Sequence, residues 1–162
     1  MPILDPRAHL RAVTERNQRL LVNDLKAIPA DKQNVSPGGA ARTALHIVAE
    51  CATVNGMVAG WLSTGQRTPR GTAEENDAHF RSFDTEEKAL AYLDQETNRL
   101  LAAIDALDPD TLGDTSDEPL GRPMSRFAVA ELPAMHIMYH DGQLTYLQTL
   151  HGDTQNHWVA NS

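Results

Sequence analysis

Residues 126–150 read RFAVAELPAMHIMYHDGQLTYLQTL, and their apolar side chains recur every three or four positions. This period predicts a helix that follows Ser125, with a kink or a loosened turn at Pro133. His136 and His140 lie four residues apart, so their side chains emerge on one helix face about one turn from each other. Apolar residues flank the two histidines on that face. The pair is therefore expected to lie in a buried stripe and to need polar partners there.

Three further segments carry helical signals. Asp5 and Pro6 combine an N-capping acid with a proline at the first helical position. Gly65 is placed to end a second helix, and Thr85 or the neighbouring Asp84 is placed to begin a third one. With the histidine-bearing segment, the expected helices span residues 6–27, 39–64, 85–107 and 126–150.

The polar residues 66–83 predict a long connection between the second and third helices. Such a connection can cross the bundle and leave these two helices parallel. Aromatic residues make up 5% of the chain, which favours helices over a β-sandwich. We therefore expect an all-α fold, a four-helix bundle with one long crossover connection. Residues 1–152 would form the bundle and residues 153–162 a C-terminal tail.

Charge and composition exclude several classes of function. The formal net charge of −8 opposes binding to phosphate backbones, so no nucleic-acid partner is expected. Cys51 is the single cysteine, so no disulfide can form within the chain. No uncharged apolar stretch approaches about 18 residues and no signal peptide is recognisable, so no membrane association is expected. A cytoplasmic protein is the expectation.

A pair of histidines one helical turn apart can chelate a metal ion, but two imidazoles alone do not complete a site. His46, on the second expected helix, is the candidate third ligand. Glu50 lies four residues after His46 and could be a fourth ligand, an acceptor for an imidazole N–H, a general base or a solvated acid. Such a pair also occurs without metal, on helix surfaces or as a hydrogen-bonded core pair.

The pattern from His136 to Gln143, H-x-x-x-H-x-G-Q, resembles the DinB-like (DinB/YfiT-like) superfamily of metalloenzymes. The stretch SPGGAARTALHIVAE, residues 36–50, is similar to the segment that carries the first histidine ligand of that family. The resemblance implies a four-helix bundle, often a homodimer, with a metal held by His46, His136 and His140. It also implies that Gln143 orients a ligand or a water molecule.

Members of this superfamily include transferases and isomerases that use low-molecular-weight thiols such as mycothiol or bacillithiol. The leading expectation is therefore a divalent-metal-dependent S-transferase or isomerase acting on a small-molecule substrate, with Glu50 or Gln143 handling protons. Zinc and nickel are favoured, and iron and copper also accept imidazole ligands. A metal-dependent hydrolase and a non-catalytic metal- or ligand-binding bundle are the alternatives. Apolar residues left over on the first and third helices would suit a homodimer.

Overall fold

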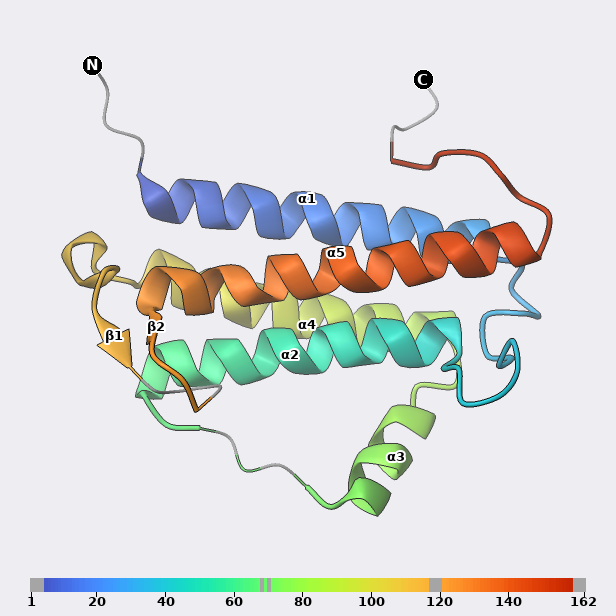
Figure 1. The fold of residues 1–162 in the computed structure, drawn as a ribbon, viewed down its shortest axis with the longest axis horizontal. Coiled ribbons are helices and arrows are strands. Elements are labelled where there is room, and N and C mark those ends of the chain that lie inside the picture. The colour runs from blue at the N-terminus through green and yellow to red at the C-terminus, as the bar shows by residue number, and fades with distance from the viewer. Residues whose placement is uncertain (1–4, 68, 70, 117–120, 159–162) are drawn as a thin grey trace.

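The computed structural model describes residues 5–67, 69, 71–116 and 121–158, and it is a four-helix bundle (Figure 1). The helices α1 and α5 run in one direction, and α2 and α4 run in the opposite direction. The expected crossover is confirmed, because the chain returns along the bundle between α2 and α4 and leaves these neighbours parallel. The four helices of the bundle are α1 (Pro6–Ala27), α2 (Ala44–Thr64), α4 (Glu86–Asp105) and α5 (Arg126–Leu150).

The helix starts follow local capping chemistry. The Asp5 side chain accepts from the backbone N–H of Arg7, and the Thr85 and Ser125 hydroxyls each accept from an amide in the first turn. Such caps satisfy backbone donors that lack a partner inside the helix, and each contributes about 1 kcal/mol. Three of the four predicted helix starts are therefore confirmed. Helix α5 is continuous through Pro133.

The predicted start of the second helix at residue 39 is wrong. Helix α2 begins at Ala44, and the Thr43 hydroxyl caps it by accepting from the backbone N–H of His46 at 3.1 Å. Gly38 and Gly39 have φ angles of 127° and 59°, which lie outside the right-handed helical region. The segment before Thr43 is therefore a loop.

Both long connections contain elements that the sequence analysis did not predict. Helix α3 (Ala73–Arg81) lies within the connection between α2 and α4. It starts with a capping box, in which Thr72 and Glu75 each accept from the backbone N–H of the other residue. The connection between α4 and α5 contains a 3-10 turn and a short antiparallel pair of strands, with bounds Pro109–Thr111 for the turn, Thr115–Ser116 for β1 and Met124–Ser125 for β2.

The bundle core consists of two apolar clusters toward opposite ends. One includes Leu21, Leu93 and Leu144, and the other includes Leu10 and Leu100. Buried polar side chains lie among these helices, and some form hydrogen bonds between helices: Asn55 donates to the Thr97 hydroxyl at 2.9 Å, and Asn17 donates to the Ala134 carbonyl at 2.9 Å. The interior of the bundle is therefore polar in places, as a buried functional site requires.

Helix α2 is long and apolar enough to cross a membrane, with a mean hydropathy of 1.2 in its most apolar window. However, 61% of that window is buried inside the bundle. The core helix of a soluble protein has the same properties, and the packing of α2 against α4 and α5 accounts for its composition.

The described part of the tail, residues 153–158, folds back over α1 and α5. Gln148 donates to the Gln155 carbonyl at 2.9 Å, and Asn23 donates to the His157 carbonyl at 3.1 Å. Beneath the tail lie two buried carboxyl groups, those of Asp24 and Asp141. Burial, and then the negative charge of Asp24, raise the pKa of Asp141 to about 7.

The buried Asp141 predicts a pH-dependent stability. Its folded-state pKa lies above the usual 3.8, so its favourable contribution is complete below about pH 4, falls as the pH rises above that value, and is fully lost above about pH 7. We expect Asp141→Asn to stabilise the protein at pH 8 by on the order of 2 kcal/mol and much less at pH 5. Urea unfolding with a chelator present, followed by circular dichroism, measures this. The exposed Asp110→Asn is the control, and an equal pH dependence in wild type and Asp141→Asn would contradict the assignment.

Candidate metal centre

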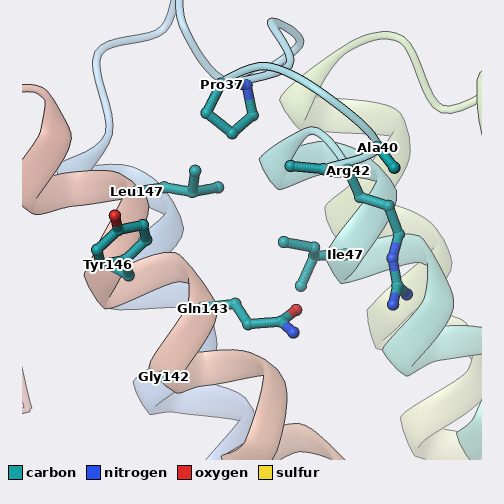
Figure 2. Close-up of a pocket in the computed structure, with 9 residues that line it drawn as sticks. Pro37, Ala40, Arg42, Ile47, Gly142, Gln143, Tyr146 and Leu147 are labelled. Carbon is teal, nitrogen blue, oxygen red and sulfur yellow. The ribbon is translucent and has the colours of Figure 1, made fainter.

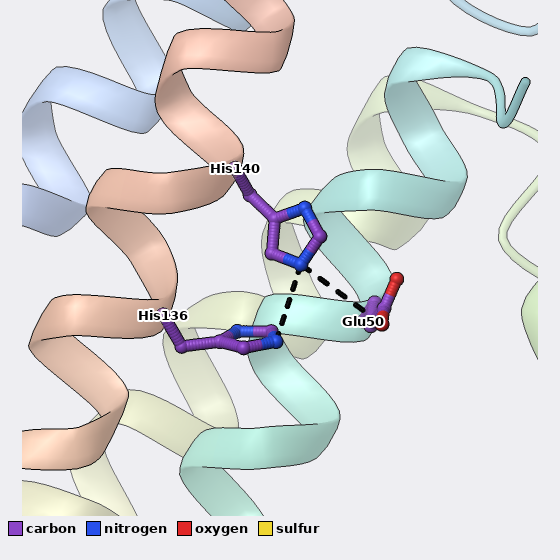
Figure 3. Close-up of side chains that lie close together, drawn as sticks. All are labelled: Glu50, His136 and His140. Carbon is purple, nitrogen blue, oxygen red and sulfur yellow. Dashed lines mark hydrogen bonds and ion pairs between the residues drawn. The ribbon is translucent and has the colours of Figure 1, made fainter.

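Three potential metal ligands converge between α2 and α5. Figure 3 shows His136 and His140, from consecutive turns of α5, lying against Glu50 of α2. The Nε2 atoms of the two histidines are 3.1 Å apart, and His140 Nε2 lies 3.9 Å from Glu50 Oε1. One ligand atom from each of the three residues lies within 4.8 Å of the others. This is the one such group of three among the described residues.

The spacing of these atoms fits a small divalent cation. Zinc–nitrogen bonds of about 2.0–2.1 Å place neighbouring tetrahedral ligands roughly 3.3 Å apart. The observed separations of 3.1 and 3.9 Å bracket this value. The residues present therefore fit a bound metal ion.

The helix packing explains why the three side chains meet. His136 and His140 share a face of α5 by their spacing of four residues, and α5 packs against α2. His140 is 2% exposed, whereas His136 and Glu50 are partly exposed. The centre therefore has a buried end at His140 and a side that solvent or a ligand can reach.

The surroundings keep the imidazoles neutral. Burial, and then the neighbouring His140 and the charge of Arg42, lower the pKa of His136 to about 4. Burial also lowers the pKa of His140 below its usual value. Neutral imidazoles present a lone pair to a metal without first losing a proton. Both predicted ligands on α5 are thus in the protonation state that metal binding needs at neutral pH.

Gln143 fixes the orientation of His140. The Gln143 Oε1 atom lies 2.8 Å from His140 Nδ1, and since a carbonyl oxygen only accepts, Nδ1 carries the proton. The lone pair of His140 is then on Nε2, the atom that faces His136 and Glu50. An outer hydrogen bond of this kind is typical of metal-binding histidines.

Glu50 has a charged neighbour that the sequence analysis did not identify. Arg42 Nη1 forms an ion pair with Glu50 Oε2. Arg42 lies in the loop before Thr43, in the same 36–50 stretch that carries the family resemblance. The sequence offered one signal for Arg42, a positive charge close to the expected start of the second helix. The ion pair itself depends on how the loop before Thr43 packs against α2.

His46 lies outside the group of three converging ligands. It is one turn before Glu50 on α2, and its ring stacks on Phe80 of α3 with ring centroids 4.6 Å apart and an interplanar angle of 21°. It is nevertheless close enough to His140 for that neighbour to contribute to the lowering of its pKa, after burial and the charge of Arg42. Ligation by His46 stays a prediction, and Glu50 takes its place in the observed cluster.

A cavity of about 420 Å³ adjoins the metal centre (Figure 2). Gln143, which contacts His140, and Arg42, which contacts Glu50, both line it. The Gln143 amide points from α5 toward the α2 side of the cavity. The other lining residues are mainly apolar or small: Pro37, Ala40, Ala41, Ile47, Gly142, Tyr146 and Leu147.

The fold and the cluster define a helical bundle with a histidine–carboxylate centre, suited to a metal ion, between two of its helices. The family model described as the DinB superfamily matches residues 13–144, and the chain belongs to this superfamily. A crystal structure of a conserved protein from Enterococcus faecalis is similar in fold, with a TM-score of 0.72 at 13% identity. The match covers 91% of this chain and 98% of that one. A comparison with curated proteins gives no match.

The geometry predicts one divalent metal ion per chain. Protein purified without a metal-affinity tag and reconstituted with zinc or nickel should contain about one equivalent by elemental analysis. We expect His136→Ala, His140→Ala and Glu50→Ala each to weaken metal binding at least about 100-fold, because each removes one of few ligands. His46→Ala tests the fourth candidate ligand in the same titration.

His9→Ala is the matched control, because His9 is an exposed histidine near the start of α1. It should bind metal as the wild type does. Unchanged stoichiometry and affinity in His136→Ala or His140→Ala would refute the assignment. Loss of metal in the control would show that binding is non-specific.

Proposed function

We propose that this protein is a divalent-metal-dependent enzyme that acts on a small molecule in the cavity beside the metal centre. The observation that carries this proposal is the convergence of His136, His140 and Glu50. A cavity of about 420 Å³ lies next to them, and two of its lining residues contact the centre: Gln143 contacts His140, and Arg42 contacts Glu50. A metal held there would lower the pKa of a thiol or a water molecule and so supply a nucleophile at neutral pH. Zinc and nickel are our first choices of metal, with iron and copper as further candidates.

The chain's own residues have distinct parts in this proposal. His136, His140 and Glu50 hold the ion, and His46 is the further ligand expected from the family resemblance. Gln143 keeps the proton of His140 on Nδ1 and therefore keeps Nε2 available. Glu50 can also accept a proton from the incoming nucleophile, because its carboxylate lies at the same centre.

We assign the activity first to a low-molecular-weight-thiol-dependent S-transferase or isomerase. Membership of the superfamily supports this choice, and so does the largely apolar lining of the cavity, which suits an organic cosubstrate better than water alone. In the transferase reaction the thiolate sulfur would form a bond to an electrophilic carbon, and the leaving group would depart with the bonding electron pair.

The test uses the zinc- or nickel-loaded protein with mycothiol, bacillithiol or a simple thiol, and an activated aryl chloride as electrophile. Chloride release should require both the metal and the thiol. We expect His140→Ala to lower kcat/KM at least about 100-fold and Gln143→Ala to lower it about tenfold, because Gln143 acts only through His140. His9→Ala should leave the rate unchanged.

A metal-dependent hydrolase is the second candidate, and the donor set favours it. Two histidines and one glutamate also hold the catalytic zinc of several hydrolases. In the same assay, a hydrolase would cleave an ester without any thiol, whereas the transferase would show no turnover under that condition. Metal that stabilises the fold but supports neither reaction would indicate a non-catalytic bundle.

We also propose that the protein is a cytoplasmic homodimer that pairs through an exposed stripe on α5. Met135, Tyr139, Tyr146 and Leu150 lie on one face of α5 and are 60%, 68%, 64% and 51% exposed. The sequence analysis placed the spare apolar surface on other helices. Large apolar side chains aligned in this way are typical of interaction surfaces. Because Tyr146 also lines the cavity, a second copy would lie beside the site.

Light scattering coupled to size-exclusion chromatography tests the dimer. Tyr139→Glu places a charge in the exposed α5 stripe and should shift the protein from dimer to monomer, because burial of an unpaired charge is costly. Ala91→Glu, on the exposed face of α4, should leave the mass unchanged. A wild-type protein that is still monomeric at a concentration of about 100 µM would contradict the proposal.

A further inference from the structure

The cavity beside the metal centre contains one charged side chain. Among the nine described residues that line it, Arg42 carries the only charge, and Gln143 provides the only side-chain amide. The remaining lining is apolar or small apart from the Tyr146 ring. The chain as a whole has a net charge of −8, so a cation in a largely apolar cavity is a local exception.

Arg42 has donors left over after its contact with Glu50. The ion pair joins Nη1 of Arg42 to Oε2 of Glu50. A guanidinium presents five N–H donors in a planar fork, so the other nitrogens can bind a further acceptor. The Arg42 side chain is 37% exposed, so a molecule that enters the cavity can reach it.

The charges at the centre favour an anionic guest. Glu50 is the one carboxylate in the group of three converging ligands, and Arg42 already forms an ion pair with it. With a divalent cation at the centre, Arg42 and that cation together outweigh the single charge of Glu50. A planar carboxylate matches the guanidinium fork.

We propose that Arg42 recognises a carboxylate on the small molecule that occupies this cavity, and so makes the protein selective for carboxylate-bearing substrates. The inference rests on the proposed function, in which a thiol and an electrophile react at the metal centre. Arg42 would bind the carboxylate of one of these two molecules. Arg42 then has two roles: it holds Glu50 in place with Nη1, and it binds the substrate carboxylate with its remaining donors. The carboxylate could belong to the thiol or to the electrophile.

The first experiment compares 3-mercaptopropionate with its methyl ester, which has the same length and thiol but no charge. The protein is loaded with cobalt(II), and thiol binding is followed by the thiolate–cobalt absorption band. We expect wild type to bind the acid about tenfold more tightly than the ester, and Arg42→Gln to abolish this preference. Arg11→Gln is the matched control, because Arg11 is similarly exposed (41%) and ion-paired to Asp105 at the other end of the bundle.

A second arm distinguishes a carboxylate on the electrophile. Propionate is titrated into the cobalt protein already saturated with 2-mercaptoethanol. Binding without displacement of the thiol band, lost in Arg42→Gln, places the carboxylate on the second molecule. The proposal is overturned if propionate fails to bind in this arm and if acid and ester bind equally in the first. It is also overturned if Arg42→Gln and Arg11→Gln behave alike.

A third arm does not require the metal. In metal-free Glu50→Gln, Arg42 has lost its competing carboxylate partner, so propionate should bind at least threefold more tightly than in metal-free wild type by calorimetry. The double variant Arg42→Gln/Glu50→Gln should lose this gain. Failure of the protein to bind cobalt would count against the proposed function alone, whereas absence of the gain in this arm would count against the role of Arg42.

Discussion

The candidate site depends on the packing of α5 against α2. This contact buries His140 almost completely and brings it within 3.9 Å of Glu50, a residue on a different helix. The same two helices also line the cavity, where Gln143 and Leu147 of α5 face Ile47 of α2. The Gln143 contact then fixes the proton on His140. A small shift of α5 would therefore change the ligand spacing, the cavity and the orientation of His140 together.

Burial favours the uncharged form of titratable groups on both sides of α5, so it lowers the pKa of the histidines and raises the pKa of Asp141. On the α2 side, burial keeps His136 and His140 neutral, so their lone pairs are available for a cation. On the α1 side, burial keeps a proton on Asp141 to an unusually high pH. Neighbouring positions 140 and 141 thus lie in two separate polar environments. Asp141 is fully buried beneath the tail, whereas His136 and Glu50 in the first environment are partly exposed.

Arg42 connects the metal centre to the cavity. Its ion pair with Glu50 orients one carboxylate oxygen, while the other oxygen faces His140. A residue in this position can affect both ligand geometry and substrate charge preference, so its substitution should change more than one property. Phe80 provides a second contact of this kind. Its ring stacks on His46, one turn before Glu50, and so links α3 to α2.

Local chemistry in the sequence determined much of the fold. Asp5, Thr85 and Ser125 cap helices through side-chain contacts within three residues, and the apolar period fixes which helix faces are buried. The spacing of His136 and His140 likewise determined that they share a face. These features were predictable because helix periodicity and capping involve residues that are near in sequence.

The tertiary structure decided which residues complete the site. Glu50 lies with the two histidines because α5 packs against α2. His46 stacks on Phe80 because α3, which lies in a connection that the sequence analysis had left irregular, contacts α2. The contact of Arg42 with Glu50 depends on a loop whose glycines delay the start of α2. Residue spacing along one helix could not predict these contacts, because each contact joins segments that are far apart in sequence and meet only in the packed bundle.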